Sequence, residues 1–598
     1  MSELRSKTLK ENAWNLKSLY QSKEEWEKEF NILLADAKEG FCQLNSFKEK
    51  IGHGDPKAVK ILLEKYFDYA RQLEKVYTFS HLRHDEDIGN DENKSSFDRS
   101  VGLYHAFSNH TSWLEPELLQ LKEEDLRDLI NHEELKDYKF YLQTLFDQKE
   151  HVLDKKQEEL LSLASKAQET PQRAFSALSN VDMKFPDIED SEGKKHKLTL
   201  GSYGKFMKSY DRTLRENAFI KTHETFAKYE NTLTALIAGQ VENHVFRMKA
   251  RGYNSCLEAA IKRYQIPTTV VTNLIDSTRK GIGSLHRYVS LRKKLLGYDK
   301  LNFWDLSVPI VKDIEMNFPY DKACEMAVDS ISILGKEYQE ILQNGLTKDA
   351  WVDRFENQGK RSGAYSSGCY DSVPYILLNY QGMLNDFMTL VHEGGHSMHS
   401  YYSNKSQAYH EANYPIFVAE VASTFNEQIA SEYLIERAKT KEERLYLLNH
   451  EIDSIRGTFF RQTMFAEFEL KIHELAEQDQ PLTKDVLKKI YLNLNADYFG
   501  PDLDLCDALS VEYMRVPHFY YNFYVYQYAT GISAASALVD NVKKNGNEAY
   551  LKFLSSGGSD YPISILQKAG VDMTSSDSVE SLIARFDDLV TKFEKEIV

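Results

Sequence analysis

Long amphipathic segments, rarely interrupted by helix-breaking residues, constrain this fold most. Only 13 prolines and 28 glycines occur in 598 residues. Apolar residues recur at helical spacing in charged, leucine-rich stretches such as "LLQLKEEDLRDLINHEELKDYKFYLQTLF" (118–146) and "KQEELLSLASKAQ" (156–168). Proline and glycine disfavour helix interiors, so their scarcity permits long helices. The sequence predicts a mainly α fold, and 42% hydrophobic residues suffice for a packed core.

Two regions interrupt the helical pattern. In "NVDMKFPDIEDSEGKKHKLTLGSY" (180–203), a turn cluster at 190–193 lies between two extended pieces and predicts a hairpin or a linker. A chain of this length exceeds one small core, so we expect an N-terminal helical domain over 1–200 and a catalytic domain over 201–598. In "GKRSGAYSSGCYDSVPYILLNYQG" (359–382), small residues followed by the apolar run 375–380 predict a small β-sheet.

Charge and cysteine usage bound the function classes. The net charge of −17 argues against nucleic acid and against anionic membrane surfaces as partners. Five separate cysteines without a Cys-x-x-Cys pair fit free thiols in a reducing compartment. The polar N-terminus does not read as a signal peptide, and no apolar run approaches about 18 residues. We therefore expect a cytoplasmic protein, whereas the oligomeric state is left open.

The segment "TLVHEGGHSM" (389–398) carries the strongest chemical signal. Leu384, Phe387, Met388 and Val391 form one apolar stripe, which predicts a helix around it. On that helix His392 and His396 lie one turn apart on one face, where two imidazoles can bind one Zn²⁺. Glu393 is rotated by about 100°, so it misses the metal but can act as general base on a metal-bound water.

Chance is the alternative explanation, because H-E-x-x-H is a short pattern in a chain with 18 histidines. The two glycines inside the segment argue against chance. Each costs a helix interior about 1 kcal/mol, and a helix tolerates Gly394 and Gly395 where a substrate or a neighbouring element must approach closely.

A catalytic zinc site needs a third protein ligand and one open position. The metzincin pattern would need a histidine at position 402, which is Tyr402 here. His399 lies about 10 Å along the helix from His392, too far to share an ion easily. In "PIFVAEVASTFNEQ", Pro415 fits a helix start, and Glu420 and Glu427 share one helical face. We favour Glu420 as the ligand, with Glu427 either supporting a ligand or facing solvent.

These residues resemble a known family. "HEGGHSMH", "PIFVAEVAST", "LTLGSYGKFMKSYDRTLRENAF" (198–219) and "GKRSGAYSSG" are similar to the thimet oligopeptidase family of zinc peptidases, most of all to its oligoendopeptidase F branch. The resemblance covers most of the chain from residue 198 on. It implies His392, His396 and Glu420 as ligands of one Zn²⁺ and Glu393 as the catalytic base. It also implies a two-lobed helical fold with a deep channel and a small sheet beside the zinc site.

A second polar stretch, "RVPHFYYNFYVYQYATG" (515–531), is rich in hydrogen-bond donors. An aromatic core stripe is the alternative, but six polar-tipped side chains within eleven residues are many for a dry interior. Oxyanions need donors besides a metal, and in the family a histidine and tyrosines of such a loop face the substrate. We expect His518, Tyr521 and Tyr528 to do so here.

The sequence therefore favours a zinc endopeptidase that cleaves short peptides internally. A peptide bound along an edge of the predicted sheet would be recognised through its backbone. One alternative is a non-catalytic peptide-binding protein with a structural zinc, which would carry no adjacent base. The other is a carboxypeptidase or dipeptidase with the same zinc ligands, which would need a fixed charge such as Arg361 to hold a peptide terminus.

Overall fold

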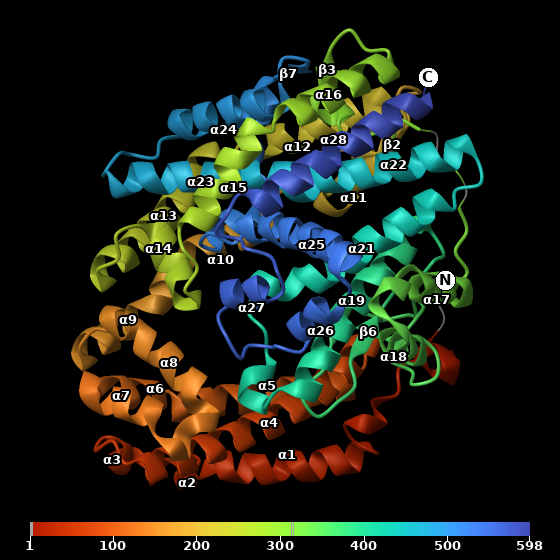
Figure 1. Cartoon of the computed structure of the whole chain (residues 1–598). Coiled ribbons are helices and arrows are strands. Elements are labelled where there is room, and N and C mark those ends of the chain that lie inside the picture. Colours follow the sequence, from red (N-terminus) through yellow and green to blue (C-terminus); the bar gives the residue numbers. More distant parts are fainter. Residues whose placement is uncertain (1–3, 312–313, 315, 598) are drawn as a thin grey trace. The chain divides into compact units, whose positions relative to one another are not determined.

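The fold is mainly α-helical, as predicted (Figure 1). A computed structural model describes residues 4–311, 314 and 316–597. The chain folds into two compact units, each assembled from three separate segments. Unit 1 contains residues 1–152, 316–430 and 538–570, and unit 2 contains residues 153–315, 431–537 and 571–598. The expected domain boundary near residue 200 stays a prediction. In the described part of the chain, no helix is both long and apolar enough to cross a bilayer.

Unit 1 begins with helices that start at strong sequence signals. The Asp55 side chain accepts a hydrogen bond from the Lys57 N–H, and Pro56 occupies the first position of α4, where its missing N–H costs nothing. Asn90 caps the next helix, α5, which packs against α4. The principal helices of unit 1 are α1 (Lys23–Lys38), α4 (Pro56–Glu86), α5 (Asp91–Thr111), α6 (Leu114–Gln120), α7 (Glu123–Asn131), α8 (Lys139–Gln148), α17 (Tyr320–Ser330), α18 (Lys336–Leu346), α19 (Leu384–Ser406), α20 (Tyr409–Ala412), α26 (Glu548–Leu554) and α27 (Pro562–Lys568).

The predicted small sheet lies in unit 1. Strands β4 (Val352–Asp353), β6 (Tyr375–Leu377) and β5 (Tyr365–Ser367) follow one another in that order. β6 pairs in parallel with β4 and antiparallel with β5, so β5 is an edge strand. β6 covers only the first half of the predicted run 375–380. The Ser366 hydroxyl lies 2.8 Å from that of Ser397, a contact that joins the edge strand to α19.

Unit 2 contains a hairpin at 188–196, within the segment 180–203 where a hairpin or a linker was predicted. β1 (Ile188–Glu189) pairs antiparallel with β2 (Lys195–His196), and Gly193 adopts a positive φ in the turn between them. The helices of unit 2 are α9 (Lys155–Gln168), α10 (Thr170–Ala177), α11 (Leu200–Met207), α12 (Arg212–Ala227), α13 (Glu230–Arg251), α14 (Cys256–Ile261), α15 (Thr269–Lys280), α16 (Gly283–Leu296), α22 (Lys441–Ile455), α23 (Arg461–Glu477), α24 (Lys484–Phe499) and α28 (Asp577–Ile597). Two further helices, α21 (Ile416–Glu436) and α25 (Tyr526–Asn545), continue across the division.

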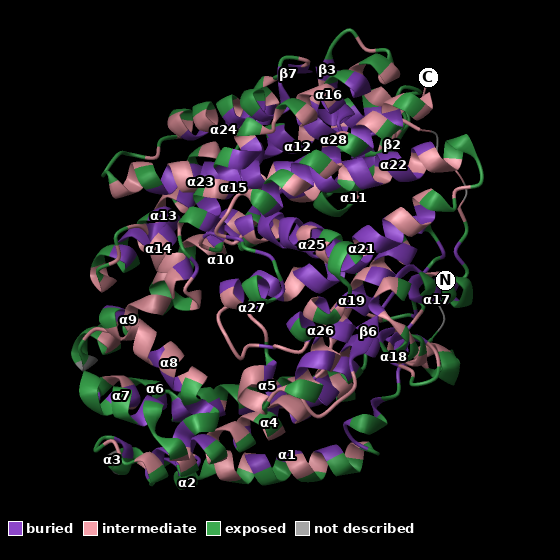
Figure 2. Cartoon of the chain, in the orientation of Figure 1, coloured by how far each residue is buried: buried purple, intermediate pink, exposed green. Residues whose placement is uncertain are grey.

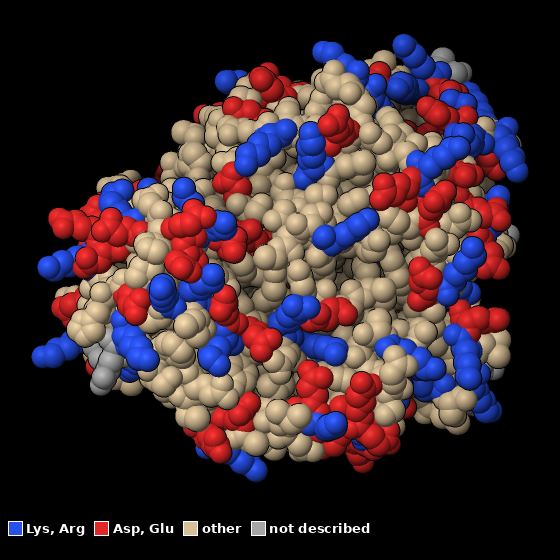
Figure 3. Space-filling view, turned by 60° about the horizontal axis from the view of Figure 1, so that its bottom comes forward, with Lys and Arg blue, Asp and Glu red and all other residues tan. Residues whose placement is uncertain are grey.

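Amphipathic helices supply the core of each unit. α28 buries Val579, Leu582, Phe586, Leu589 and Phe593, which recur at spacings of three and four residues. Figure 2 shows buried residues gathered on the inward sides of helices and exposed residues on their outer sides. Figure 3 shows Lys and Arg interspersed with Asp and Glu on the face that it draws.

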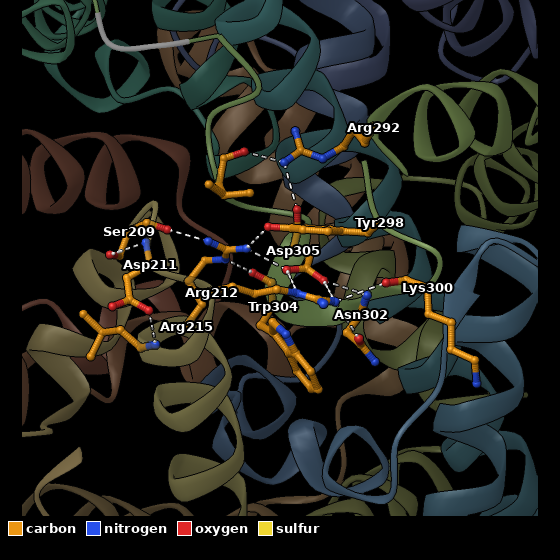
Figure 4. A network of polar contacts seen from close by, with 12 residues as sticks. Ser209, Asp211, Arg212, Arg215, Arg292, Tyr298, Lys300, Asn302, Trp304 and Asp305 are labelled. Atoms are coloured by element: carbon orange, nitrogen blue, oxygen red, sulfur yellow. Dashed lines mark hydrogen bonds and ion pairs between the residues drawn. The ribbon is translucent and has the colours of Figure 1, made fainter. Parts of the chain in front are cut away.

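A buried ionic network fastens α12 within unit 2 (Figure 4). Arg215 and Asp305 are fully buried and form an ion pair with a distance of 2.7 Å between Nη2 and Oδ1. Arg212 binds the other oxygen of Asp305 at 2.8 Å. Breaking such a buried pair typically costs about 3–5 kcal/mol because one charge stays uncompensated. The two arginines of "SYDRTLRENAF" (209–219) are therefore accounted for by packing inside unit 2.

Candidate active site

Two helices of unit 1 position the candidate metal ligands. α19 carries His392 and His396, as the apolar stripe predicted, and α21 begins directly after Pro415 and carries Glu420. His392 Nε2 lies 3.2 Å from His396 Nε2, and each of these atoms lies 3.4 Å from Glu420 Oε2. Among the described residues, these three side chains form the one group of three or more His, Cys, Asp or Glu side chains suited to a metal ion.

Gly395 permits this arrangement. A Cβ at position 395 would lie 2.6 Å from the carbonyl oxygen of Ala422 and from Cα of Ser423, both on α21. At Gly394 a Cβ would meet only the Leu342 side chain at 3.4 Å. A neighbouring element therefore approaches the helix closely at Gly395, as expected, and that element is α21.

The electrostatic potential at this cluster of ligands favours a positive charge. Although burial lowers the pKa of His392, the hydrogen bond and charge of Glu427 and the charges of Glu393 and Glu420 together outweigh it and raise this pKa to about 9. Although burial raises the pKa of Glu420, His396 and His392 outweigh it and lower this pKa to about 2. A site that favours a proton on His392 beside an ionised Glu420 also favours a metal cation.

Glu427 contacts the outer nitrogen of His392. Its Oε1 lies 3.3 Å from His392 Nδ1, whereas the Nε2 of the same ring faces His396 and Glu420. A carboxylate at this place accepts the Nδ1–H and leaves Nε2 with its lone pair toward the metal position. Of the two roles that the sequence left open for Glu427, the contact favours support of a ligand over exposure to solvent.

Glu393 faces a cavity instead of joining the ligand cluster. Its side chain is 8% exposed, and burial raises its pKa, which the charges of His392 and His396 partly oppose. The backbone of Ser366, on β5, lies near enough to oppose this rise in the pKa as well. Glu393 and His392 line a cavity of about 470 Å³ together with Gly363, Ala364 and other residues. The edge strand thus lies directly beside the candidate base.

Two other polar candidates, and the thiol of Cys369, lie outside the cluster. His399 is 1% exposed and stacks on Tyr414 with ring centroids 3.7 Å apart. Arg361 forms an ion pair with Asp85 at 3.1 Å, which accounts for its charge. Cys369 is buried, and burial raises the pKa of its thiol to about 12, so it is no nucleophile. All five cysteines are free, as predicted.

The aromatic stretch lies in unit 2, and its side chains divide into two sets. Tyr520 and Tyr526 are buried. His518 and Tyr528 lie 3.4 Å apart from Nε2 to the hydroxyl, and the His518 ring contacts those of Tyr521 and Tyr524 with centroids 5.7 Å apart. The structure therefore brings the three predicted residues together and adds Tyr524.

Comparison with known proteins decides the class of protein. The sequence model described as "Peptidase family M3" matches residues 205–584, and the one described as "Oligopeptidase F" matches residues 117–185. The chain belongs to peptidase family M3. The resemblance based on the motifs is thereby confirmed, as is the prediction of an enzyme: this member of family M3 is a metallopeptidase.

Relatives match this chain over nearly its whole length. It is 41% identical to oligopeptidase PepF of Bacillus subtilis, over 99% of this chain and 88% of that protein. It is 37% identical to group B oligopeptidase PepB of Streptococcus agalactiae, over 99% and 98%. The structure of oligoendopeptidase-F from Enterococcus faecium matches with a TM-score of 0.75 at 34% identity, covering 96% of this chain and 99% of that one.

Sequence reasoning missed three features of the site. Ser366 approaches Glu393 through its backbone, which leaves no side-chain signal. Tyr524 stood among the aromatic candidates, but its place beside His518 depends on a loop conformation that periodicity does not reveal. The difference between the buried Tyr520 and the exposed Tyr521 was not visible in the sequence, because the part of this stretch before α25 is neither a regular helix nor a strand.

Proposed function

We propose that this chain is a zinc endopeptidase that hydrolyses internal bonds of short oligopeptides. The observation that carries this proposal is the convergence of His392, His396 and Glu420 beside the buried carboxyl of Glu393. The relatives named as oligopeptidases and as an oligoendopeptidase support the same substrate class.

The three side chains fit a tetrahedral zinc ion. With zinc–ligand bonds of about 2.0–2.1 Å, two tetrahedral ligands lie about 3.3–3.4 Å apart. The separations of 3.2, 3.4 and 3.4 Å between the three donor atoms match this spacing. Two imidazoles and one carboxylate are also a ligand set of catalytic zinc, which leaves a fourth position open. When bound, Zn²⁺ would supply Lewis acidity to a water molecule and to a peptide carbonyl.

Glu393 would serve as general base. Its carboxylate would accept a proton from the attacking water and deliver it to the leaving nitrogen. Burial strengthens this base, because it raises the pKa of Glu393. Glu427 would hold the His392 ring by accepting its Nδ1–H. His518, Tyr521 and Tyr528 would donate hydrogen bonds to the oxygen on which negative charge develops.

The edge strand β5 would bind the peptide backbone. Its free edge offers main-chain donors and acceptors, and the Ser366 backbone marks how close this edge lies to Glu393. Backbone recognition would give broad sequence preference. The free cysteines support a reducing, cytoplasmic location.

Two alternatives remain distinguishable. A structural zinc site is closed by four protein ligands, whereas the described residues supply three and place a carboxyl beside them. A carboxypeptidase or dipeptidase would need a charge to hold a peptide terminus, and Arg361 already pairs with Asp85. Both observations favour an endopeptidase.

Metal analysis and peptide digestion test the proposal together. Purified protein is expected to contain one zinc per chain, to cleave a mixed pool of short peptides at internal bonds, and to lose and regain this activity on chelation and zinc addition. Products that lack only terminal residues would favour the end-trimming alternative. A zinc-loaded protein that cleaves nothing would favour the binding protein.

A further inference from the structure

His518, on the 3₁₀ turn Pro517–Tyr520, and Tyr528, in the first turn of α25, are joined by a loop that rests on buried polar side chains of unit 2. We call Gln240, His244, Glu469 and His473 the support network; the first two lie on α13 and the last two on α23. All four are buried. Gln240 contacts the main chain at Tyr520, and Glu469 contacts it at Phe523.

The loop holds a turn that needs external support. Asn522 and Phe523 both adopt the left-handed backbone conformation, with φ values of 53° and 57°. This conformation is uncommon for residues with a Cβ, and two in succession persist only where the surroundings hold them. The turn lies between His518 and Tyr528 in the chain, so its shape sets where both side chains point.

Glu469 is the side chain that holds the turn. Its Oε1 accepts a hydrogen bond of 2.6 Å from the Phe523 N–H. The side chain is fully buried, and within the described residues its Oε2 has no hydrogen-bond partner. The ring of Phe523 also packs on His473, with centroids 4.5 Å apart.

The histidines form a directed chain of hydrogen bonds. His473 Nδ1 lies 2.8 Å from the carbonyl oxygen of Glu469, which only accepts, so Nδ1 carries the proton. His473 Nε2 then accepts from His244 Nδ1 at 3.0 Å, and His244 Nε2 accepts from Gln240 Nε2 at 2.9 Å. The same amide nitrogen also donates to the Tyr520 carbonyl oxygen at 3.3 Å. Every donor meets an acceptor only when both imidazoles are neutral.

We propose that Glu469 is a positioning residue of the peptidase: it fixes the Asn522–Phe523 turn, while the chain from His473 to Gln240 fixes Tyr520, and together they place His518 and Tyr528 for the substrate. This proposal rests on the proposed function, which assigns substrate contacts to His518 and Tyr528. It concerns residues that touch neither the metal ligands nor the substrate.

The charge of Glu469 gives the support network a pH dependence. Burial raises the pKa of Glu469 to about 8, and the hydrogen bond from Phe523 opposes this only in part. The other titratable side chains of the support network are His473 and His244, and burial lowers the pKa of both. At pH 7 the acid is therefore protonated and the imidazoles are neutral. Displacement lets water reach the carboxylate and returns its pKa toward the ordinary value of about 4.5, so a displaced loop becomes progressively more favourable as the pH rises to about 8 and no more so above it.

A matched pair of variants tests the proposal. Glu469→Gln keeps an uncharged acceptor, and Glu469→Met keeps the length without the acceptor. Glu474→Met, on the exposed side of the same helix, is the control. For each protein, kcat and KM on a short peptide, zinc content and hydrogen exchange of residues 516–528 are measured from pH 6 to pH 9.5.

Glu469→Met is expected to exchange this segment at least ~10-fold faster and to lower kcat by about 10–100-fold with little change in KM or zinc, since small misplacements cost that much. Glu469→Gln should match the unaltered protein at pH 6 and lack its loss of kcat as the pH rises to about 8. Should Glu469→Met fail to fold, Gln240→Met is expected to raise exchange around Tyr520 and lower kcat in the same way.

Unchanged exchange and kcat in Glu469→Met would overturn the proposal. So would faster exchange with unchanged kcat, or a Glu469→Gln protein as impaired as Glu469→Met. Failure of the proposed function would give a different result. The Glu393→Gln variant would then retain turnover, and the hydrogen exchange of residues 516–528 in that variant would equal that of the unaltered protein.

Discussion

Glu420 and His399 both follow the H-E-x-x-H segment, yet their surroundings differ. Glu420 Oε2 lies 3.4 Å from both inner imidazole nitrogens, whereas His399 is buried against Tyr414. Glu420→Ala is therefore expected to weaken zinc affinity by more than ~100-fold, because it removes a ligand and not merely a supporting contact worth about 10–100-fold. His399→Ala should keep the metal and lose stability through a buried cavity. Competition with a zinc chelator decides between them, and the opposite ranking would show that the ligand set is misassigned.

At the scale of single residues, the sequence predicted those site residues that are brought together by their spacing on one helix. His392 and His396 share a helical face by arithmetic, and Glu393 follows from the same helix. The contact of Glu427 with His392 Nδ1 depends on how two helices cross, so the sequence left two roles open for it. Within the support network around Glu469, His244 and His473 lie 229 residues apart in the chain, and no local pattern connects them.

The close approach of α19 and α21 is the element-scale condition for the site. Gly395→Ala would place a Cβ 2.6 Å from the Ala422 carbonyl oxygen and is expected to cost about 1–3 kcal/mol of stability and to weaken zinc binding, because the helices must separate. Gly394→Ala is the matched control, since its Cβ meets only a side chain and alanine favours the helix. Thermal unfolding with and without zinc compares the two. Equal effects of both substitutions would contradict the close-approach explanation.

Helices and strands were predictable where the sequence has a clear apolar periodicity or a clear start or turn signal. α19, the helix start after Pro415 and the hairpin around Gly193 follow from apolar spacing, a proline and a turn cluster. β6 ends at Leu377 instead of Tyr380, since pairing with β4 and β5 and not β propensity sets its length. The functional role of the irregular stretch around His518 was predicted only from its polar side chains, because short 3₁₀ turns leave no periodic pattern in the sequence.

At the scale of the whole molecule, the sequence could not predict which segments of the chain pack together in each unit. Each compact unit combines three segments that lie far apart in the chain, and such long-range packing leaves no trace in local periodicity. The composition predicted the helical class, and the motifs predicted the family. The expected channel and the domain boundary near residue 200 stay predictions.

Substrate length is the property that belongs to this scale. A deep channel, which the family resemblance implies, would admit extended peptides of roughly 7–20 residues and exclude folded domains, whose unfolding costs about 5–15 kcal/mol. Shorter peptides should have a lower kcat because they lack remote binding energy. A ladder of peptides around one scissile bond, run beside a stable folded domain, measures this. Efficient digestion of the folded domain would refute an enclosed site.

The most direct test of the central claim separates the metal from the base. Glu393 adjoins His392 but lies outside the group formed by His392, His396 and Glu420. Zinc content and kcat are therefore measured for Glu393→Gln beside the unaltered protein. We expect one zinc per chain in both and a kcat lower by about 10²–10⁴-fold or more in the variant, the usual loss on removal of a general base. A variant that retains full turnover, or that loses its zinc, would contradict the account.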